Sequence, residues 1–450
     1  MILRTLTRVI ALILFTELLS TAQSTASNET PPNIAIVGGR LLDGWGGMPV
    51  EDSVVLIRDK WIVSVGRRGQ LPIPSQCQVI DASGMTVMPG LIDMHVHLDD
   101  VGHTDLTYPG SLYKRGLTPQ IMALMAKALL MSGVTTARDV GAPLNEILTL
   151  RDKSNRGEIV SARLFVTGPF LAKNVDAKND FDHWKIDGPE DARNKVRTLV
   201  SKGVDWIKIV DTYKMSPAEV QAIVGEAHKA GKPVAAHAMY AEEIQMLLDA
   251  GVSKIDTFEH TGLLVKSPKF KEDVVRTIVE REISIDPTII VIETFAQMEN
   301  YPGWKDDPEW KASLPPDIWQ EVRASLEDYQ KIWFYNLARY GKGAERSRLK
   351  QLVDAGAQVI MGSDSGARAN PHNEGAWREM ALMEEIGMSP MEVIMASTRI
   401  PAQLLGVGDQ LGTIEPRRKA DILVIDGDPL ADMVYLRHPK HIVKDGVIYK

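Results

Sequence analysis

Short apolar segments alternate with longer segments of helical periodicity through the middle of the chain. The apolar segments predict eight strands, at residues 91–97, 134–138, 163–167, 206–210, 234–237, 254–259, 284–288 and 358–362. Helix start signals lie between or after them, since Ser216 and Ser389 are each followed by Pro and, at the third position, by Glu. Right-handed crossovers close eight strand–helix units into a (β/α)8 TIM barrel, so we predict the α/β class. A doubly wound open sheet is the alternative.

The two ends of the chain share a different pattern. Residues 33–90 contain short apolar runs separated by Gly, Asp and Lys, and residues 411–450 repeat this pattern. Asp445 and Gly446 precede an apolar run and are typical of a hairpin turn. We therefore expect one small β-sandwich domain built from both ends, with the barrel domain over residues 91–410 between them.

The first residues have the pattern of an export signal. Arg4 and Arg8 precede the largely apolar residues 9–19, and small residues follow at 20–22. The apolar run is shorter than the roughly 20 residues that span a bilayer, which makes a permanent anchor the weaker interpretation. We predict a signal peptide over residues 1–26 and an exported protein, periplasmic or secreted, with no stable membrane span after cleavage.

Composition excludes several classes of protein. The chain has 450 residues, with 51 Lys and Arg against 59 Asp and Glu, which gives a formal net charge of −8. This acidic balance lacks the positive field that nucleic-acid binding requires. Cys77 is the single cysteine, so no intrachain disulfide is possible.

Six residues with the chemistry of metal ligands fall on or next to predicted strands. His95 and His97 stand two apart on the first strand and therefore point to the same face. The others are Lys208, His237, His260 and Asp364. Carboxyl ends of barrel strands converge on one mouth, and four imidazoles with a carboxylate suit Zn2+, Fe2+ or Mn2+. Histidines hydrogen-bonded in the core are the alternative explanation.

Lys208 lies among apolar residues, where an amine loses hydration and tends to lose its proton. A neutral amine can react with CO2 to form a carbamate, which can bridge two cations. A lysine that extends from the strand end towards water is the alternative.

The chain resembles the amidohydrolase superfamily, particularly its imidazolonepropionase and Xaa-Pro dipeptidase related branch. The motifs that carry the resemblance are, in order, MPGLIDMHVHL, VDWIKIV, AAHAM, TFEHTG, MGSDSG and ADILVIDGDPL. The resemblance implies two divalent ions, with Zn2+ as the expected metal. It assigns one ion to His95, His97 and Asp364, the other to His237 and His260, and a bridging carbamate to Lys208.

The resemblance and the residues together predict an exported binuclear amidohydrolase. Metal-bound hydroxide would attack the amide carbonyl of an Xaa-Pro dipeptide or N-acyl amino acid, and Asp364 would carry the proton to the leaving amine. A mononuclear cyclic-amide hydrolase like imidazolonepropionase is one alternative. A catalytically inactive binding protein on the same fold is another.

Substrate contacts are harder to predict. Tyr240, Arg368 and His372 are candidate substrate-binding residues near the predicted mouth, whereas we expect His103 and His183 to be surface histidines. The segment 170–187 departs from the Gly-Gly-His-Gly segment associated with the dipeptidases. We expect a small-molecule amide or dipeptide as partner and a homo-oligomeric assembly.

An insertion over residues 289–351 holds four of the nine tryptophans, Trp304, Trp310, Trp319 and Trp333. A lid over an apolar substrate, a packed helical hairpin and a subunit interface each explain them.

Overall fold

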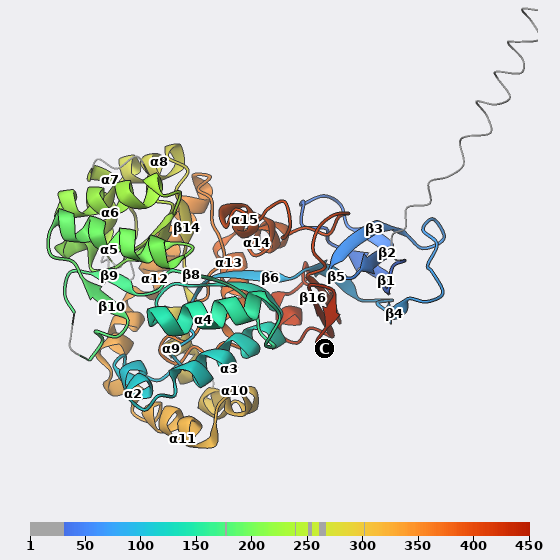
Figure 1. Ribbon diagram of the computed structural model, residues 1–450, viewed down its shortest axis with the longest axis horizontal. Helices are drawn as coiled ribbons and strands as arrows, with labels where there is room; N and C mark the ends of the chain where they lie inside the picture. Colours follow the sequence, from blue (N-terminus) through green and yellow to red (C-terminus); the bar gives the residue numbers. More distant parts are fainter. Residues whose placement is uncertain (1–30, 176–177, 239, 251–253, 261–266, 301) are drawn as a thin grey trace, which may run out of the picture.

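The computed structural model describes residues 31–175, 178–238, 240–250, 254–260, 267–300 and 302–450. The predicted signal peptide over residues 1–26 lies outside these residues. In Figure 1 a small β-rich part lies at one end of an elongated molecule, and a larger part of helices and strands lies at the other. None of the helices in the described residues is long and apolar enough to cross a membrane.

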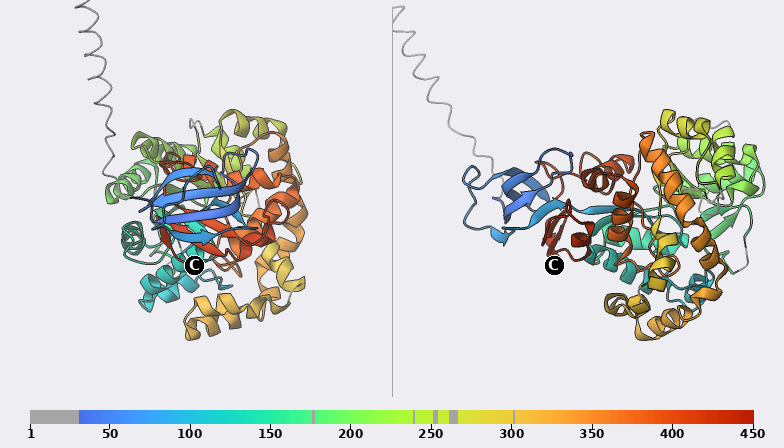
Figure 2. Two further views of the ribbon diagram at one scale, coloured as in Figure 1. Left: turned by 90° about the vertical axis from the view of Figure 1, so that its right-hand side faces the viewer. Right: turned by 180° about the vertical axis from the view of Figure 1, so that it is seen from behind.

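Strands from both ends of the chain lie in one eight-stranded sheet. Its order is β17-β16-β15-β5-β1-β2-β3, with β4 paired to β1. The N-terminal strands are β1 (Ile34–Leu41), β2 (Val50–Arg58), β3 (Trp61–Arg67), β4 (Gln78–Asp81) and β5 (Thr86–Pro89), and the C-terminal ones are β15 (Ile422–Ile425), β16 (His441–Lys444) and β17 (Val447–Ile448). Antiparallel pairing of β15 with β5, with Leu423 opposite Met88, joins the two ends. Figure 2 shows this sheet face on.

The predicted hairpin at Asp445 and Gly446 is confirmed, because β16 and β17 pair antiparallel around it. Gly446 has a φ of +72°, and a Cβ there would lie 1.7 Å from the carbonyl oxygen of Asp59. Both the backbone angle and the close approach therefore require glycine.

The middle of the chain supplies parallel strands in two ladders. One has the order β6-β7-β8 and the other β10-β9-β11-β12-β13-β14. Their bounds are β6 (Leu91–Val96), β7 (Val134–Asp139), β8 (Arg163–Val166), β9 (Phe170–Ala172), β10 (His183–Lys185), β11 (Ile207–Ile209), β12 (Val234–His237), β13 (Thr257–Glu259) and β14 (Ser284–Asp286). Seven of the eight predicted strands are present, whereas β9 and β10 are short strands that the apolar pattern does not predict.

The eighth predicted strand, at residues 358–362, makes only a single bridge, between Val359 and Ile285. The amide of Ile360 donates to the carbonyl oxygen of Ile285, whereas that of Met361 donates to Ala396. Because successive amides bond to different neighbours, no continuous ladder forms, although the segment is extended and buried. It lies between β14 and β6, since Ser365 bridges to Val96.

Helices surround the parallel strands (Figures 1 and 2). They are α2 (Tyr108–Lys114), α3 (Thr118–Met131), α4 (Leu144–Asn155), α5 (Pro189–Lys202), α6 (Pro217–Lys229), α7 (Ala241–Asp249), α8 (Glu272–Glu280), α13 (Gly375–Ile386), α14 (Pro390–Ala396) and α15 (Arg399–Leu404), with short 3-10 turns η1 (Thr212–Lys214) and η4 (Met433–Arg437). The capping boxes predicted at Ser216 and Ser389 are both present. Each satisfies backbone N–H groups that have no partner within the helix.

The tryptophan-containing insertion is helical. It comprises α9 (Ile290–Asn300), η2 (Pro302–Asp306), α10 (Pro308–Ser313), α11 (Pro316–Ser325), η3 (Tyr329–Lys331) and α12 (Trp333–Asp354). Trp304, Trp310 and Trp319 are buried, and the ring of Trp310 lies 6.3 Å from that of Trp304 and 5.6 Å from that of Trp319. Three of the four tryptophans therefore build a packed helical unit, whereas Trp333 is exposed.

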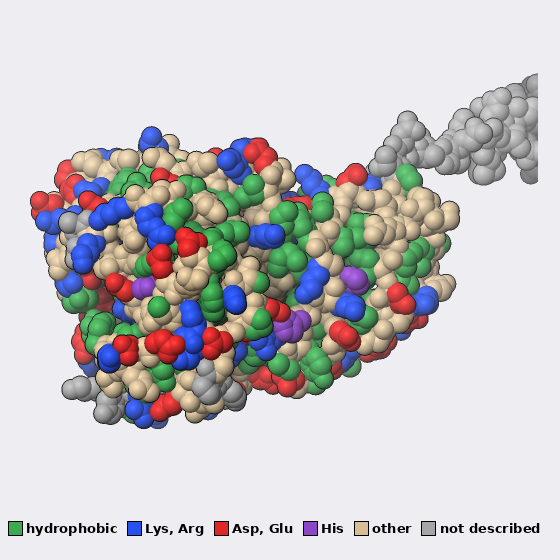
Figure 3. Space-filling view, turned by 90° about the horizontal axis from the view of Figure 1, so that it is seen from below, with side chains coloured by type: hydrophobic (Ala, Val, Ile, Leu, Met, Phe, Trp, Pro, Cys, Tyr) green, Lys and Arg blue, Asp and Glu red, His purple; other side chains and the backbone are tan. Residues whose placement is uncertain are grey.

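The space-filling view supports the inference drawn from composition. On the face in Figure 3, Lys and Arg side chains are interspersed with Asp and Glu, and neither sign forms a continuous patch. The described residues on this face therefore offer no basic surface for a nucleic-acid backbone.

Candidate active site

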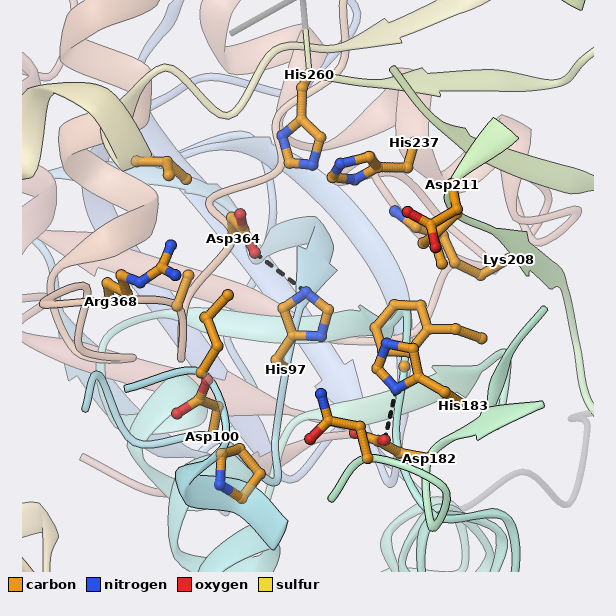
Figure 4. Close-up of a pocket in the computed structure, with 18 of the residues that line it drawn as sticks. His97, Asp100, Asp182, His183, Lys208, Asp211, His237, His260, Asp364 and Arg368 are labelled. Carbon is orange, nitrogen blue, oxygen red and sulfur yellow. Dashed lines mark hydrogen bonds and ion pairs between the residues drawn. The ribbon is translucent and has the colours of Figure 1, made fainter. Parts of the chain in front are cut away.

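The six predicted metal-ligand residues meet in one cavity of about 560 Å³. Five of them lie on or directly after a parallel strand, and Asp364 follows the extended segment 358–362; Figure 4 shows five of the six around a common space. The ring of His95 lies 5.3 Å from that of His97 and 5.1 Å from that of His260, which in turn lies 4.5 Å from that of His237.

Asp364 lies at the centre of this cluster. Its Oδ1 is 3.1 Å from Nε2 of His97 and 3.6 Å from Nε2 of His95. Its backbone N–H donates to the carbonyl oxygen of His95 over 2.7 Å. Asp364 and His260 have left-handed φ angles of +53° and +72°, a strained conformation for residues with side chains. Such strain often accompanies functional positions, because the surrounding structure must maintain it.

Three of the four imidazoles, those of His95, His237 and His260, are neutral near pH 7, whereas the Asp364 carboxylate outweighs burial and raises the pKa of His97. Burial, followed by the positive charge of Lys208, lowers the pKa of His95 to about 4 and that of His237 to about 3. The pKa of His260 is also well below its usual value, first through burial and then through the charge of His237. Neutral imidazole is the form that binds a metal ion. His95, His97 and Asp364 bring ligand atoms within 4.8 Å of one another, a geometry that can hold an ion.

Lys208 is buried in the middle of β11 and is 1% exposed. Its Nζ has no hydrogen-bond partner among the described residues. Burial lowers the pKa of this amine to about 8. A buried amine without a partner is costly in a folded protein, and this one faces the imidazole cluster. The site therefore fits a group that would bind both the amine and the imidazoles, as a metal centre with a carboxylated lysine does.

A buried ion-pair network that the sequence analysis did not identify lies behind the cluster. Oε2 of Glu259 is 2.6 Å from Nδ1 of His95, and Oε1 accepts a hydrogen bond of 2.8 Å from Arg138. Arg138 also lies 3.4 Å from Asp286 and donates through Nε to the carbonyl oxygen of Met94. The sequence does contain a signal for this network, because Arg138 and Glu259 are charged residues at the ends of apolar strands. Such residues are buried in a sheet only when they are paired.

Another side of the cavity is lined by Phe170, Asn174, Asn179, Asp182 and His183. His183 lines the cavity and lies 2.6 Å from Asp182, so the prediction of a surface histidine is wrong for His183. The reason is that β10 pairs with β9, which turns Asp182 and His183 towards the cavity, where the charge of Asp182 adds to burial in raising the pKa of Asp99. Burial raises the pKa of Asp100 to about 7. His103 does not line the cavity and stacks on Tyr108.

Only one of the three candidate substrate residues lines the cavity. Arg368 lies opposite Lys208 in Figure 4; the charges of Asp100, Asp105 and Asp364 act on it, but among the described residues none of these carboxylates lies close enough to form an ion pair. Tyr240 precedes α7, where its N–H donates to Glu243 and its ring contacts Tyr213. His372 is buried behind His97, with Nε2 3.0 Å from the carbonyl oxygen of His97.

Comparison with known proteins gives matches over most of the chain. The family model described as "Amidohydrolase family" matches residues 86–449. An imidazolonepropionase from Geobacillus sp. (strain WCH70) is 22% identical over 433 residues, covering 88% of this chain and 90% of that protein. A dihydroorotase from Geobacter metallireducens is 44% identical over only 71 residues. The chain spans 16% of the length of that dihydroorotase.

Solved structures are similar over nearly the entire chain. The crystal structure of a Xaa-Pro dipeptidase with bound methionine in the active site has a TM-score of 0.73 and 24% identity, covering 93% of this chain and 99% of that one. A putative prolidase from Bifidobacterium longum has a TM-score of 0.73 and 26% identity, covering 94% of this chain and 96% of that one.

Proposed function

From the premise that this chain belongs to the amidohydrolase family, we propose that it is a metal-dependent hydrolase of a carbon–nitrogen bond in a small amide. One observation carries the proposal: the buried amine of Lys208, without a hydrogen-bond partner in the described residues, shares a cavity with four imidazoles and Asp364. A protein without a ligand at this place would leave the amine desolvated and unpaired at a cost of about 1–3 kcal/mol.

We infer that two ions would share this donor set. His95, His97 and Asp364 would hold one divalent ion, His237 and His260 the other, and Lys208 as a carbamate would lie between them. Zn2+ is the metal we favour, because imidazole and carboxylate are its usual ligands in hydrolases. Two such ions, when bound, supply a nucleophile from water at neutral pH and polarise a carbonyl group.

Asp364 is the residue we assign to proton transfer. Burial raises its pKa, but the neighbouring imidazoles His95 and His97 outweigh burial and hold the pKa well below its usual range. The carboxylate is therefore ionised, and its place beside the imidazoles makes it the group we propose to take a proton and to deliver it to the leaving amine. Asn370 holds the segment in place, since its Nδ2 donates to the carbonyl oxygens of Ser363 and Asp364.

For the substrate we propose a dipeptide or an N-acyl amino acid. Arg368 has a guanidinium without an ion-pair partner in the described residues and faces the cluster, which suits a substrate carboxylate. Tyr240 and His372 would act indirectly, through the helix α7 and through His97. The structures of prolidases over more than nine-tenths of the chain support a dipeptide.

The closure of the barrel, the β-sandwich domain and the export of the protein are also proposals. We infer that the parallel strands close into one barrel over residues 91–410, which is supported by the bridges of 358–365 to β14 and β6 and by hydrogen bonds from Asp205 and Trp206 to Val166. The end segments 33–90 and 411–450 would form the β-sandwich domain. Export is supported by the pattern of residues 1–26.

A mononuclear hydrolase of a cyclic amide is the second candidate. The match to an imidazolonepropionase along 88% of the chain favours it. The buried Lys208 favours two metals instead, because a single ion needs no bridging group. An inactive binding protein would have no reason to keep all six residues in one cavity.

The test is to purify the full chain, count its metal ions and screen amides. Two ions per chain with turnover of Xaa-Pro dipeptides or N-acyl amino acids are the expected result. One ion with turnover of cyclic amides alone would establish the second candidate. Absence of bound metal after reconstitution with Zn2+, Mn2+ and Fe2+ would refute both.

A further inference from the structure

One wall of the cavity is apolar and reaches to its mouth. We define this apolar wall as Leu106, Pro109, Trp333 and Phe334, all of which line the cavity. Leu106 and Pro109 come from the segment after β6 and the start of α2, whereas Trp333 and Phe334 begin α12 in the insertion. Two segments more than 200 residues apart in the sequence therefore line the same cavity, and Arg368 contacts both, at Thr104 and at Phe334.

The wall is a firm surface that nothing in the described residues covers. Trp333 is 60% exposed and Leu106 is 49% exposed, whereas Phe334 beneath them is 3% exposed. The ring of Trp333 stands edge-on to that of Phe334 at 5.6 Å, and Phe334 packs against Phe295 at 5.8 Å. The exposed ring is thus anchored through Phe334 to the core of the insertion.

Arg368 connects the wall to the reactive cluster. Its guanidinium carbon lies 5.0 Å from the ring centre of Phe334 and 5.8 Å from that of Trp333. Its Nε donates to the carbonyl oxygen of Thr104 over 3.1 Å, which fixes the side chain between the two segments of the wall. A positive charge and an apolar surface are therefore immediate neighbours on one side of the cavity.

We propose that the apolar wall is the subsite for the side chain of a bulky apolar amino acid, whose carboxylate is bound by Arg368 and whose nitrogen belongs to the amide that is cleaved. This inference rests on the proposed function and names its substrate class. Carboxylate and side chain branch from the same α-carbon in an amino acid, which matches the adjacency of Arg368 and the wall. The enzyme would thus release leucine, phenylalanine or a similar residue from its acyl partner.

The apolar wall would favour large side chains because their binding removes apolar surface from water. A large side chain laid against Trp333 and Leu106 covers both exposed groups, whereas alanine covers almost none of their surface. Hydrophobic pockets discriminate by about 10–200-fold for each methylene that they bury well. For an open wall that covers one side of the substrate, we expect about 100-fold in kcat/KM between phenylalanine and alanine.

The test uses the full metal-loaded chain and two substrates with one acyl group, N-acetyl-L-alanine and N-acetyl-L-phenylalanine. Trp333→Ala and Leu106→Ala should each lower the phenylalanine-to-alanine ratio of kcat/KM by about tenfold. Trp45→Ala is the matched control, because Trp45 is also exposed (49%) and also lies under an arginine, with the guanidinium carbon of Arg399 5.3 Å from its ring, but belongs to the terminal sheet region. The control should leave the ratio unaltered.

The outcomes separate this inference from the proposed function. Hydrolysis of both substrates with equal kcat/KM, or a ratio that neither wall variant changes, overturns the apolar subsite and leaves the hydrolase proposal standing. No hydrolysis of any amide overturns the proposed function. In that case the subsite is tested by binding of N-acetyl-L-phenylalanine, monitored through the quenching of tryptophan fluorescence. Quenching that is lost in Trp333→Phe and retained in Trp45→Phe supports the subsite. Equal quenching in both variants refutes it.

Discussion

Oε2 of Glu259 lies 2.6 Å from Nδ1 of His95, and both side chains are fully enclosed by protein. A carboxylate this close favours a hydrogen on Nδ1, which leaves the lone pair of Nε2 on the cavity side, where Oδ1 of Asp364 lies 3.6 Å away. The other oxygen of Glu259 is held by Arg138, which keeps the carboxylate ionised and oriented. Glu259 directly precedes His260 in the sequence, but it therefore orients His95 on β6 instead.

Replacing Glu259 by Gln should weaken metal binding without emptying the site. The amide keeps the size of the side chain but removes the charge that raises the basicity of His95, and such partners contribute about 10–100-fold to metal affinity. Competition with a chelator of known affinity measures the change. The exposed Glu272→Gln, on α8, serves as control. Equal affinity of Glu259→Gln and the wild type would show that Glu259 has no influence on the ligand.

Asp364→Asn should keep much of the bound metal and lose most turnover, by about 10²–10⁴-fold in kcat. An amide oxygen can still act as a ligand, but the amide cannot accept and return the proton. Elemental analysis and steady-state kinetics on the same preparation separate the two effects. Asp354→Asn, which removes a surface carboxylate paired with Lys350, is the control. An Asp364→Asn enzyme with undiminished kcat would assign proton transfer to another group.

Lys208→Ala should reduce the metal content from two ions towards one per chain, because the bridging group is lost. Acetate or propionate should restore part of the metal and the activity, since a short carboxylate fits the space vacated by the side chain. Lys229→Ala, at the exposed end of α6, should show neither loss nor rescue. Full occupancy and activity of Lys208→Ala without added carboxylate would make Lys208 a structural residue.

Glu345→Gln should stabilise the fold at alkaline pH. Both carboxylate oxygens of Glu345 are buried without a hydrogen-bond partner among the described residues, and burial, followed by the charge of Glu379, holds the pKa well above its usual value. The native state then binds a proton that the unfolded chain releases at lower pH, so stability falls as pH rises above about 4.5.

Glutamine cannot ionise, so Glu345→Gln removes this loss of stability at high pH. Urea denaturation at pH 5 and pH 8 should give a smaller decrease in the free energy of unfolding for Glu345→Gln than for the wild type, by about 1–3 kcal/mol. Glu280→Gln, at the exposed end of α8, should follow the wild type. The same decrease in all three proteins would mean that the Glu345 carboxyl titrates normally.

The positions that the sequence predicts well are those whose signal is local. Alternating geometry on a strand is sufficient to place His95 and His97 on one face, and the Ser–Pro–Glu pattern is sufficient to start α6 and α14. The order of the five motifs that carry the six candidate ligands likewise identifies the residues that share the cavity, because all parallel strands present their carboxyl ends on one side.

The positions that it misses depend on contacts between distant segments. Arg138 and Glu259 are 121 positions apart, and neither has a local pattern that names its partner. Segment 358–362 has the composition of a strand, yet its backbone N–H groups donate to two different neighbours, Ile285 and Ala396. His183 follows no apolar run, and it reaches the cavity only because β9 and β10 pair across the mouth.

The hydrogen bond from the N–H of Asp364 to the carbonyl oxygen of His95 also sets the order of assembly. His95 emerges from the ribosome 269 residues (364 − 95) before Asp364, and the bond that aligns the two cannot form until residue 364 of 450 has been synthesised. Any metal captured earlier would be held by an incomplete set of histidines with the freedom of an unfolded chain. The complete set of donor side chains in this cavity is therefore available only late in synthesis, once the last fifth of the chain begins to emerge.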